Sequence, residues 1–101
     1  MDVIDNKHLK ELYRKGSSKK LKLPKQVIKK FHMRVDAIMN ANSIHDLWAN
    51  PSLYFKKLQG DKNMYSMRLD RQYRLEMEVK WINEAQSIGK FYLKKVSNHY
   101  E

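Results

Sequence analysis

The strongest constraint on the fold is a strict alternation of apolar and charged residues from Tyr73 to Trp81. The odd positions of this stretch are all apolar, and the even positions are all charged: Arg74, Glu76, Glu78 and Lys80. Successive side chains of a β-strand point to opposite faces, so one face of this segment is dry and the other is wet. The sequence therefore predicts a strand over residues 73–81 that packs on a core through one face only.

Three further segments of the second half are expected to form strands beside it. Met64 to Leu69 alternates in the same way and is followed by the short turn Asp70-Arg71-Gln72, which predicts a hairpin. A strand from Ile88 to Val96 follows a polar turn, and Leu53 to Leu58 supplies one more, entered from Asn50-Pro51. The prediction is an antiparallel meander.

The first half has the spacing of two amphipathic helices. From Lys7 to Lys15, apolar residues three and four positions apart share one helix face, and Asn6 is placed to cap this helix. A longer helix from Pro24 to about Ala41 carries an apolar stripe. The stripe consists of Ile28, Phe31, Val35 and Ile38, widened by Val27 and Met39. The charged residues of this helix, Arg34 among them, are expected to face away from the core.

Together these elements predict an α+β fold in which two N-terminal helices pack on the dry face of an antiparallel β-sheet. A length of 101 residues fits one domain that spans residues 1–101. The other face of the sheet is left open. Arg68 and Arg74 occupy wet positions of adjacent strands, so we expect them on this open face together with lysines of the last strand. Such a face is suited to a phosphate backbone.

The chain carries a formal charge of +10, and most of it lies in the first third of the sequence. Residues 1–35 contribute +8, and the other 66 residues contribute +2. A field of this strength attracts polyanions, above all nucleic acids, whose sequence-independent binding depends on cations at the phosphates. An acidic protein partner, or a solvated lysine-rich helix surface without any partner, would account for the same charge.

Two absences from the sequence narrow the chemistry. The chain has no cysteine, which excludes disulfides, thiolate zinc sites and cysteine nucleophiles. It also lacks the roughly 18 uninterrupted apolar residues of a membrane-spanning helix and has no signal-like start, so we expect a cytoplasmic protein without a membrane segment. The histidines His8, His32 and His45 lack the spacing of metal ligands, and no metal site is expected.

Several sequence blocks occur in the order typical of one protein family. They are Leu23-Pro24-Lys25, Leu53 to Asp61, Tyr65 to Leu69, Gln72 to Leu75, and the ending Val96 to Tyr100. Through these blocks the chain resembles, over nearly its whole length, the HigB-like toxins of the RelE/ParE superfamily, small basic partners in bacterial type II toxin–antitoxin pairs. The resemblance implies a RelE-like fold and a cognate antitoxin, expected to be a small helix-turn-helix protein of the HigA kind.

The resemblance also implies an activity, the cleavage of mRNA on the translating ribosome. Such toxins promote attack of a ribose 2′-hydroxyl on the adjacent phosphate, which needs a base, an acid and cations around the charged phosphorane, but no metal or other cofactor. The candidates for these roles are His99, which matches the near-terminal histidine of the family, Arg74, which matches the arginine of its aromatic–Arg pair, Arg68, one strand earlier, and Lys56.

The chain departs from the typical family pattern at some of these positions. Lys56 stands where the typical branch has a histidine, and Gln59 stands where it has a lysine. A lysine can neutralise charge on a phosphorane, but an amine is a poor base at pH 7. Two alternatives therefore stay open, a ParE-like toxin that binds DNA gyrase without catalysis and a catalytically degenerate RNA-binding module.

A second group of residues consists of candidates for contacting RNA outside the catalytic centre. The cations of this group are Lys57, Lys19, Lys20 and Lys22. The aromatic members are Tyr92 and Tyr100, because readers of single-stranded RNA stack bases on aromatic rings. Packing is the ordinary role of a strand tyrosine, and a lone histidine near a chain end, such as His99, is often only solvated.

Overall fold

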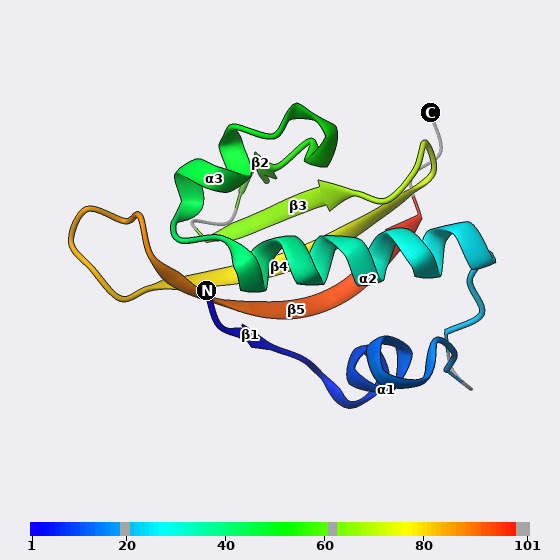
Figure 1. Cartoon of the computed structure of the whole chain (residues 1–101). Helices are drawn as coiled ribbons and strands as arrows, with labels where there is room; N and C mark the ends of the chain where they lie inside the picture. Colours follow the sequence, from blue (N-terminus) through cyan, green and yellow to red (C-terminus); the bar gives the residue numbers. More distant parts are fainter. Residues whose placement is uncertain (19–20, 61–62, 99–101) are drawn as a thin grey trace.

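A computed structural model describes residues 1–18, 21–60 and 63–98 and has an α+β architecture. In Figure 1, the long helix α2 lies across the front of a five-stranded sheet, and α1 lies below it. The helices are α1 (Lys7–Lys15), α2 (Lys25–Asn40) and α3 (Ile44–Trp48), with a 3₁₀ turn η1 (Pro51–Leu53). The strands are β1 (Val3–Ile4), β2 (Lys56–Lys57), β3 (Met64–Arg68), β4 (Tyr73–Trp81) and β5 (Gly89–Asn98).

The strands follow the order β1-β5-β4-β3-β2 across the sheet. Strands β2 to β5 form the predicted antiparallel meander. Strand β1, which was not predicted, pairs in parallel with β5, with Val3 opposite Phe91. The sheet is therefore mixed, and the expectation of a purely antiparallel sheet was wrong at this edge. Two residues are too few to show an alternation in the sequence, so the pattern gave no sign of this strand.

The core lies between α2 and the dry face of the sheet, as predicted. Phe31 and Ile38 of α2 are fully buried, and so are the odd positions of β4 at Leu75, Met77 and Val79. The helix α1 adds Leu9 and Leu12 to the same hydrophobic cluster. The alternation of β4 thus separates a buried face from a face that the helices do not cover (Figure 1).

The ends of the two long helices are held by polar groups. The side chain of Asn6 accepts a hydrogen bond of 2.9 Å from the amide of Leu9, which confirms the predicted cap of α1. Pro24 lies at the cap position just before α2. At the other end of α2, the ammonium group of Met1 donates hydrogen bonds to the carbonyls of Ile38 and Ala41, both at 3.0 Å. A positive charge at this end is favourable because the carbonyl end of a helix dipole is negative.

Two residues of α2 differ from their predicted exposure. Arg34 is buried, with only 8% of its surface exposed, whereas Met39 is 44% exposed although it was expected to widen the apolar stripe. Arg34 lies next to Val35 on the edge of the stripe, and its guanidinium reaches backbone carbonyls that satisfy it. A prediction from residue type alone therefore placed both side chains on the wrong side of α2.

The segment from Leu53 to Leu58 forms much less strand than predicted. Its first part belongs to η1, and Tyr54 then adopts a left-handed conformation with φ 47° and ψ 44°. Only Lys56 and Lys57 pair with β3, because a left-handed residue breaks the extended backbone that a strand needs. The short helix α3 just before this segment was not predicted.

Strand β5 contains an irregularity that its sequence reflects. Met77 lies opposite Leu93, but Glu76 lies opposite Lys95, so the strand carries a β-bulge at Lys94. The bulge allows both Leu93 and Val96 to face the core side, although they are three residues apart. The adjacent Lys94 and Lys95 are both exposed.

No helix within the described ranges combines the length and the apolar character that crossing a membrane would require.

Candidate nucleic-acid interface

Two arginines lie side by side on the sheet face that the helices leave open. Arg68, at the end of β3, is the direct cross-strand partner of Arg74 on β4, and Arg74 in turn lies opposite Ser97 on β5. Cross-strand partners project from the same face, about 5 Å apart at Cβ. We call Arg68, Arg74 and Ser97 the arginine row. The structure thus places the two arginines as cross-strand neighbours on the sheet face predicted for them.

A second row runs parallel to the arginine row across four strands. It consists of Lys56, Ser66, Glu76 and Lys95, each the cross-strand partner of the next; we call it the serine row. Ser66 is fully buried, and Nη1 of Arg74 lies 3.4 Å from its hydroxyl oxygen, which links the two rows. Lys57 lies opposite Tyr65 on the buried-face parity of β3, so only Lys56 belongs to this row.

The guanidinium of Arg68 is held in place by two contacts. Its Nε donates a hydrogen bond of 3.2 Å to the carbonyl of Asp70, and its Cζ lies 4.6 Å from the centre of the Tyr54 ring. Asp70 also shapes the turn between β3 and β4, because its Oδ1 accepts the amides of Gln72 and Tyr73, each at 2.8 Å. The turn and the arginine are therefore fixed by the same short segment.

Buried Arg34 supports this end of the sheet from the helix side. Its Nε donates to the carbonyl of Arg68 at 3.0 Å, and its Nη2 donates to the carbonyl of Ser52 at 3.1 Å. Burial lowers the pKa of Arg34, because removal from water disfavours the charged form. Arg34 thus joins α2 to the last residue of β3 and to η1, and acts on the arginine row only through the backbone.

Tyr92 lies on the same sheet face but away from the arginine row. Its cross-strand partner on β4 is Glu78. Glu78 is four residues from Arg74, and four residues span about 13 Å along a strand. The ammonium of Lys80 lies 4.8 Å from the centre of the Tyr92 ring, and Lys94 forms an ion pair of 3.4 Å with Glu78. The structure therefore does not bring Tyr92 together with Arg68 and Arg74.

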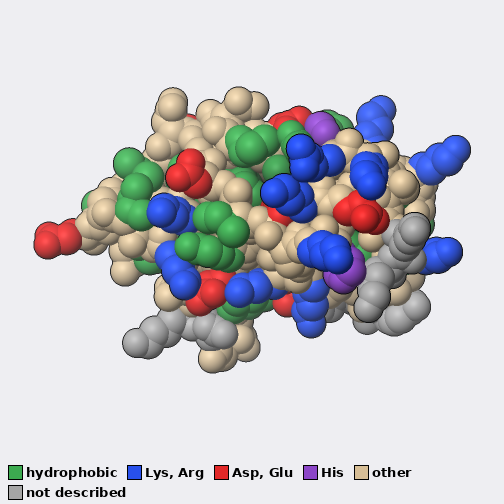
Figure 2. Space-filling model, turned by 90° about the horizontal axis from the view of Figure 1, so that it is seen from below, with side chains coloured by type: hydrophobic (Ala, Val, Ile, Leu, Met, Phe, Trp, Pro, Cys, Tyr) green, Lys and Arg blue, Asp and Glu red, His purple; other side chains and the backbone are tan. Residues whose placement is uncertain are grey.

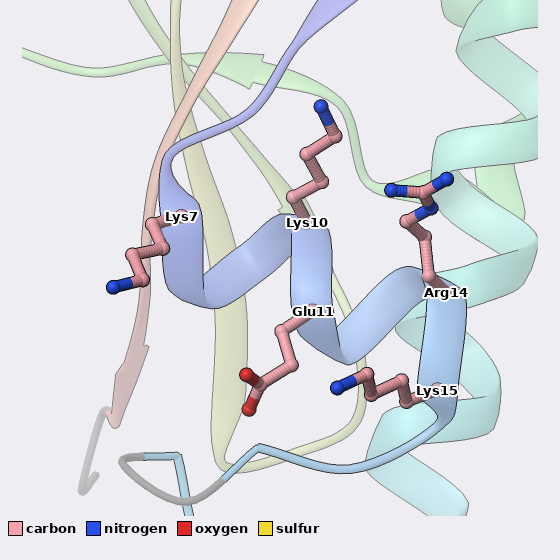
Figure 3. A pocket seen from close by; sticks show the side chains of 5 residues that line it. All are labelled: Lys7, Lys10, Glu11, Arg14 and Lys15. Carbon is pink, nitrogen blue, oxygen red and sulfur yellow. The ribbon is translucent and has the colours of Figure 1, made fainter.

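A separate cationic surface lies on α1. Its solvent face lines a shallow hollow of about 240 Å³ with Lys7, Lys10, Glu11, Arg14 and Lys15. Figure 3 shows all five side chains projecting from this one helix. In Figure 2, Lys and Arg side chains crowd the end of the molecule that carries α1, whereas hydrophobic side chains gather toward the opposite end.

The helix α1 is fastened to α2 by a polar and aromatic contact. The hydroxyl of Tyr13 donates a 2.5 Å hydrogen bond to Oδ1 of Asp36, and the Tyr13 ring stacks on His32 with centroids 4.1 Å apart. The hydrogen bond to Asp36 raises the pKa of Tyr13. Nδ1 of His32 lies 3.2 Å from the other carboxylate oxygen of Asp36. The cationic surface therefore rests on a helix with a defined position.

Four of the residues predicted to contact or cleave RNA lie outside the described residues. They are Lys19, Lys20, His99 and Tyr100. The described part of β5 ends at Asn98, opposite Tyr73 and next to the arginine row. Lys22 is exposed in the segment between α1 and α2, and belongs to neither row.

The two rows provide cations, a carboxylate and a hydroxyl on one surface. Guanidinium groups stabilise the negative charge that develops on a phosphate during its transfer, and a carboxylate such as Glu76 can accept a proton. Sequence reasoning did not assign a role to Ser66, Glu76 or Tyr54. Ser66 and Glu76 could have been found, because both occupy wet positions of the alternating strands, whereas the position of Tyr54 depends on a turn that has no clear sequence signal.

The chain is related to known proteins through one family. The model of a family described as the RelE-like toxin of the type II toxin–antitoxin system HigB matches residues 3–95. A search of curated proteins finds no match. The family match includes both rows of the open face except Ser97 and agrees with the resemblance seen in the sequence.

Proposed function

The chain belongs to the HigB-like toxin family, and from this membership we propose that it cleaves messenger RNA on the translating ribosome. Members of the family are toxins of type II toxin–antitoxin systems and generally endoribonucleases, and each is paired with a cognate antitoxin. The observation that supports the proposal for this chain is the pairing of Arg68 with Arg74 across β3 and β4. Two arginines that are cross-strand neighbours on an open sheet face suit the binding of a transferring phosphate.

The proposed reaction is attack of a ribose 2′-hydroxyl on the adjacent phosphorus. The 2′ oxygen forms a bond to phosphorus, the bond to the 5′ oxygen of the next nucleotide breaks, and the products are a 2′,3′-cyclic phosphate and a 5′-hydroxyl. Arg68 and Arg74 stabilise the phosphorane, and Lys56 adds positive charge from the neighbouring row. Glu76 accepts the proton of the 2′-hydroxyl, and His99, which is outside the described residues, donates a proton to the leaving oxygen.

The experiment that tests this function maps RNA 5′ ends in cells after induction of the toxin without its antitoxin. Wild type should create new 5′ ends on translated messages. Arg74→Gln and His99→Gln should lower their yield by about 10²–10³-fold, as expected when a charge-stabilising or proton-transferring group is removed. Lys30→Gln, which removes an exposed cation from α2, is the matched control and should cleave as wild type does. Absence of new ends with wild type would refute the nuclease proposal.

One observation favours a second candidate, a toxin that binds DNA gyrase without catalysis. The described histidines, His8, His32 and His45, all lie on helices and none lies on the sheet. If catalysis needs an imidazole, it depends on His99 alone. Inhibition of purified gyrase by wild type, with no RNA cleavage in cells, would establish this alternative, and unaffected gyrase would exclude it.

We further propose that the antitoxin is a helix-turn-helix protein of the HigA kind and that its acidic residues cover a cationic surface of the toxin in the cytoplasm. The arginine row and α1 offer two such surfaces. A complex held by charge should weaken as salt increases, since the screening length falls to about 3 Å at 1 M salt. A complex that stays intact in 1 M salt would show that apolar contacts dominate instead.

A further inference from the structure

Tyr54 is an exposed aromatic residue whose backbone is in an unfavourable conformation. Its backbone is in the left-handed region at φ 47°, which bulky residues seldom adopt and which Gly or Asn adopts more readily. Its side chain is nevertheless exposed, with 54% of the residue surface accessible. A strained position with an aromatic ring outside the core is not explained by packing, and such positions cluster at binding sites.

The other described tyrosines contact groups within the fold, and Tyr73 is partly buried against the core. Tyr65 is buried and stacks on Phe55 at 5.1 Å, and Tyr13 is bonded to Asp36. Tyr92 lies under the ammonium of Lys80. Tyr54 alone among the described tyrosines is exposed.

Hydrogen bonds within residues 51–54 and to Arg34 hold the ring of Tyr54 beside Arg68 of the arginine row. Its amide donates to the carbonyl of Pro51 at 3.1 Å, and the carbonyl of Ser52 is held by buried Arg34. On the side toward the sheet, the Arg68 guanidinium lies over the ring. The remaining ring surface faces solvent beside a cation that is already fixed by the carbonyl of Asp70. The platform is therefore formed before any ligand arrives.

We propose that Tyr54 and Arg68 form a stacking site for one unpaired nucleobase of single-stranded RNA. The inference rests on the proposed function, and it assigns to the open face a base contact beside the phosphate contacts of Arg68 and Arg74. Aromatic rings and guanidinium planes are the surfaces on which proteins stack splayed bases. A ring whose backbone and cationic neighbour are already fixed loses little conformational freedom on binding.

The test compares Tyr54→Asn with Tyr54→Phe in direct binding of a short unstructured RNA. Asparagine tolerates the left-handed backbone but has no ring, so the melting temperature should stay within about 5 °C of wild type. It should weaken binding of the RNA about tenfold, as expected for the loss of one base–aromatic stack. Phenylalanine keeps the ring and should bind as wild type does. Lys30→Gln, which removes an exposed cation from α2, serves as the control for a change of charge alone.

A second probe separates base stacking from attraction to phosphates. An oligomer of the same length in which every base is missing keeps the phosphates but offers nothing to stack. Wild type and Tyr54→Asn should bind it equally, whereas Arg68→Gln should bind it more weakly than either. Equal binding of the complete RNA by wild type and Tyr54→Asn would overturn the stacking site while leaving the proposed function intact. Failure of wild type to bind the free RNA at all would overturn the stacking site, whereas the proposed function is tested separately by the mapping of RNA 5′ ends in cells.

Discussion

Buried Arg34 provides the sharpest test of how the open face is supported. Its guanidinium donates to the carbonyls of Arg68 and Ser52, and no acidic partner is paired with it in the described part of the chain. We consider the substitution Arg34→Met, which keeps an unbranched apolar stem in the same space but removes both hydrogen bonds. The change should leave the carbonyls of Arg68 and Ser52 without a hydrogen-bond donor in a site with little access to water.

The size of the effect follows from these two bonds. A hydrogen bond to a charged group contributes about 1.5–3 kcal/mol, and a buried acceptor left unpaired costs about 1–3 kcal/mol. Removal of the guanidinium from water acts in the opposite direction, and the same desolvation lowers the pKa of Arg34. We therefore expect a net loss of about 3 kcal/mol in the free energy of unfolding. For a domain of this size that loss lowers the melting temperature by roughly 12–24 °C.

Urea unfolding at pH 7, followed by circular dichroism, measures the loss directly. Lys30→Met is the matched control, because it removes an exposed cation from the same helix and should change stability by less than about 0.5 kcal/mol. Arg34→Lys should fall between wild type and Arg34→Met, since one ammonium can still serve one of the carbonyls. If Arg34→Met and Lys30→Met lose the same small amount, the two carbonyls do not depend on Arg34 and the reasoning is refuted.

Three further substitutions test individual contacts. Asp5 has a buried Oδ1 without a hydrogen-bond partner among the described residues, and burial raises its pKa. The folded state therefore holds this proton more tightly than the unfolded state, and ionisation reduces stability as the pH rises above about 4. Asp5→Asn should raise the melting temperature at pH 7 and give no gain near pH 3; an equal gain at both values would contradict the cause. Gly89→Ala should cost about 1–3 kcal/mol in urea unfolding, because an added Cβ would lie 2.7 Å from Cγ1 of Val79; an unchanged midpoint would show that the strand adjusts. Tyr13→Phe removes the donor to Asp36 and should cost about 1 kcal/mol. Since this hydrogen bond raises the Tyr13 pKa, its contribution to stability is complete at neutral pH and is lost in the alkaline range where the hydroxyl ionises. Urea unfolding at increasing pH should therefore show the stability difference between wild type and Tyr13→Phe becoming smaller.

The elements with a strong periodic pattern could be predicted from the sequence almost to the residue. The alternation over residues 73–81 coincides with β4, and the helix over residues 7–15 coincides with α1. The segment from Leu53 to Leu58 could not be predicted in the same way, because a single left-handed residue, Tyr54, ends the turn before the strand begins. Strand β1 is specified by its contact with β5, which is distant in the sequence, and not by a local pattern.

The candidate site was accessible to sequence reasoning only where strand parity determines it. Arg68 and Arg74 could be placed on one face because each lies at a wet position of an alternating strand. The choice between Lys56 and Lys57 needed the register of β2, since a shift of one residue reverses the face. Arg34 was predicted on the wrong side of α2 because the spacing of apolar residues cannot show that buried backbone carbonyls are available as hydrogen-bond acceptors for its guanidinium.

The position of β5 in the sheet has a consequence for how the chain folds as it is synthesised. β5 follows the other described strands in the chain, yet it lies between β1 and β4, so β1 has no neighbour in the sheet until β5 has been synthesised. Pairing of segments so far apart in the chain is slow, and one edge of β4 stays unpaired in the meantime. Ser97 joins Arg74 only at that last stage. The sheet, and with it the arginine row, is therefore complete only after β5 has taken its place between β1 and β4.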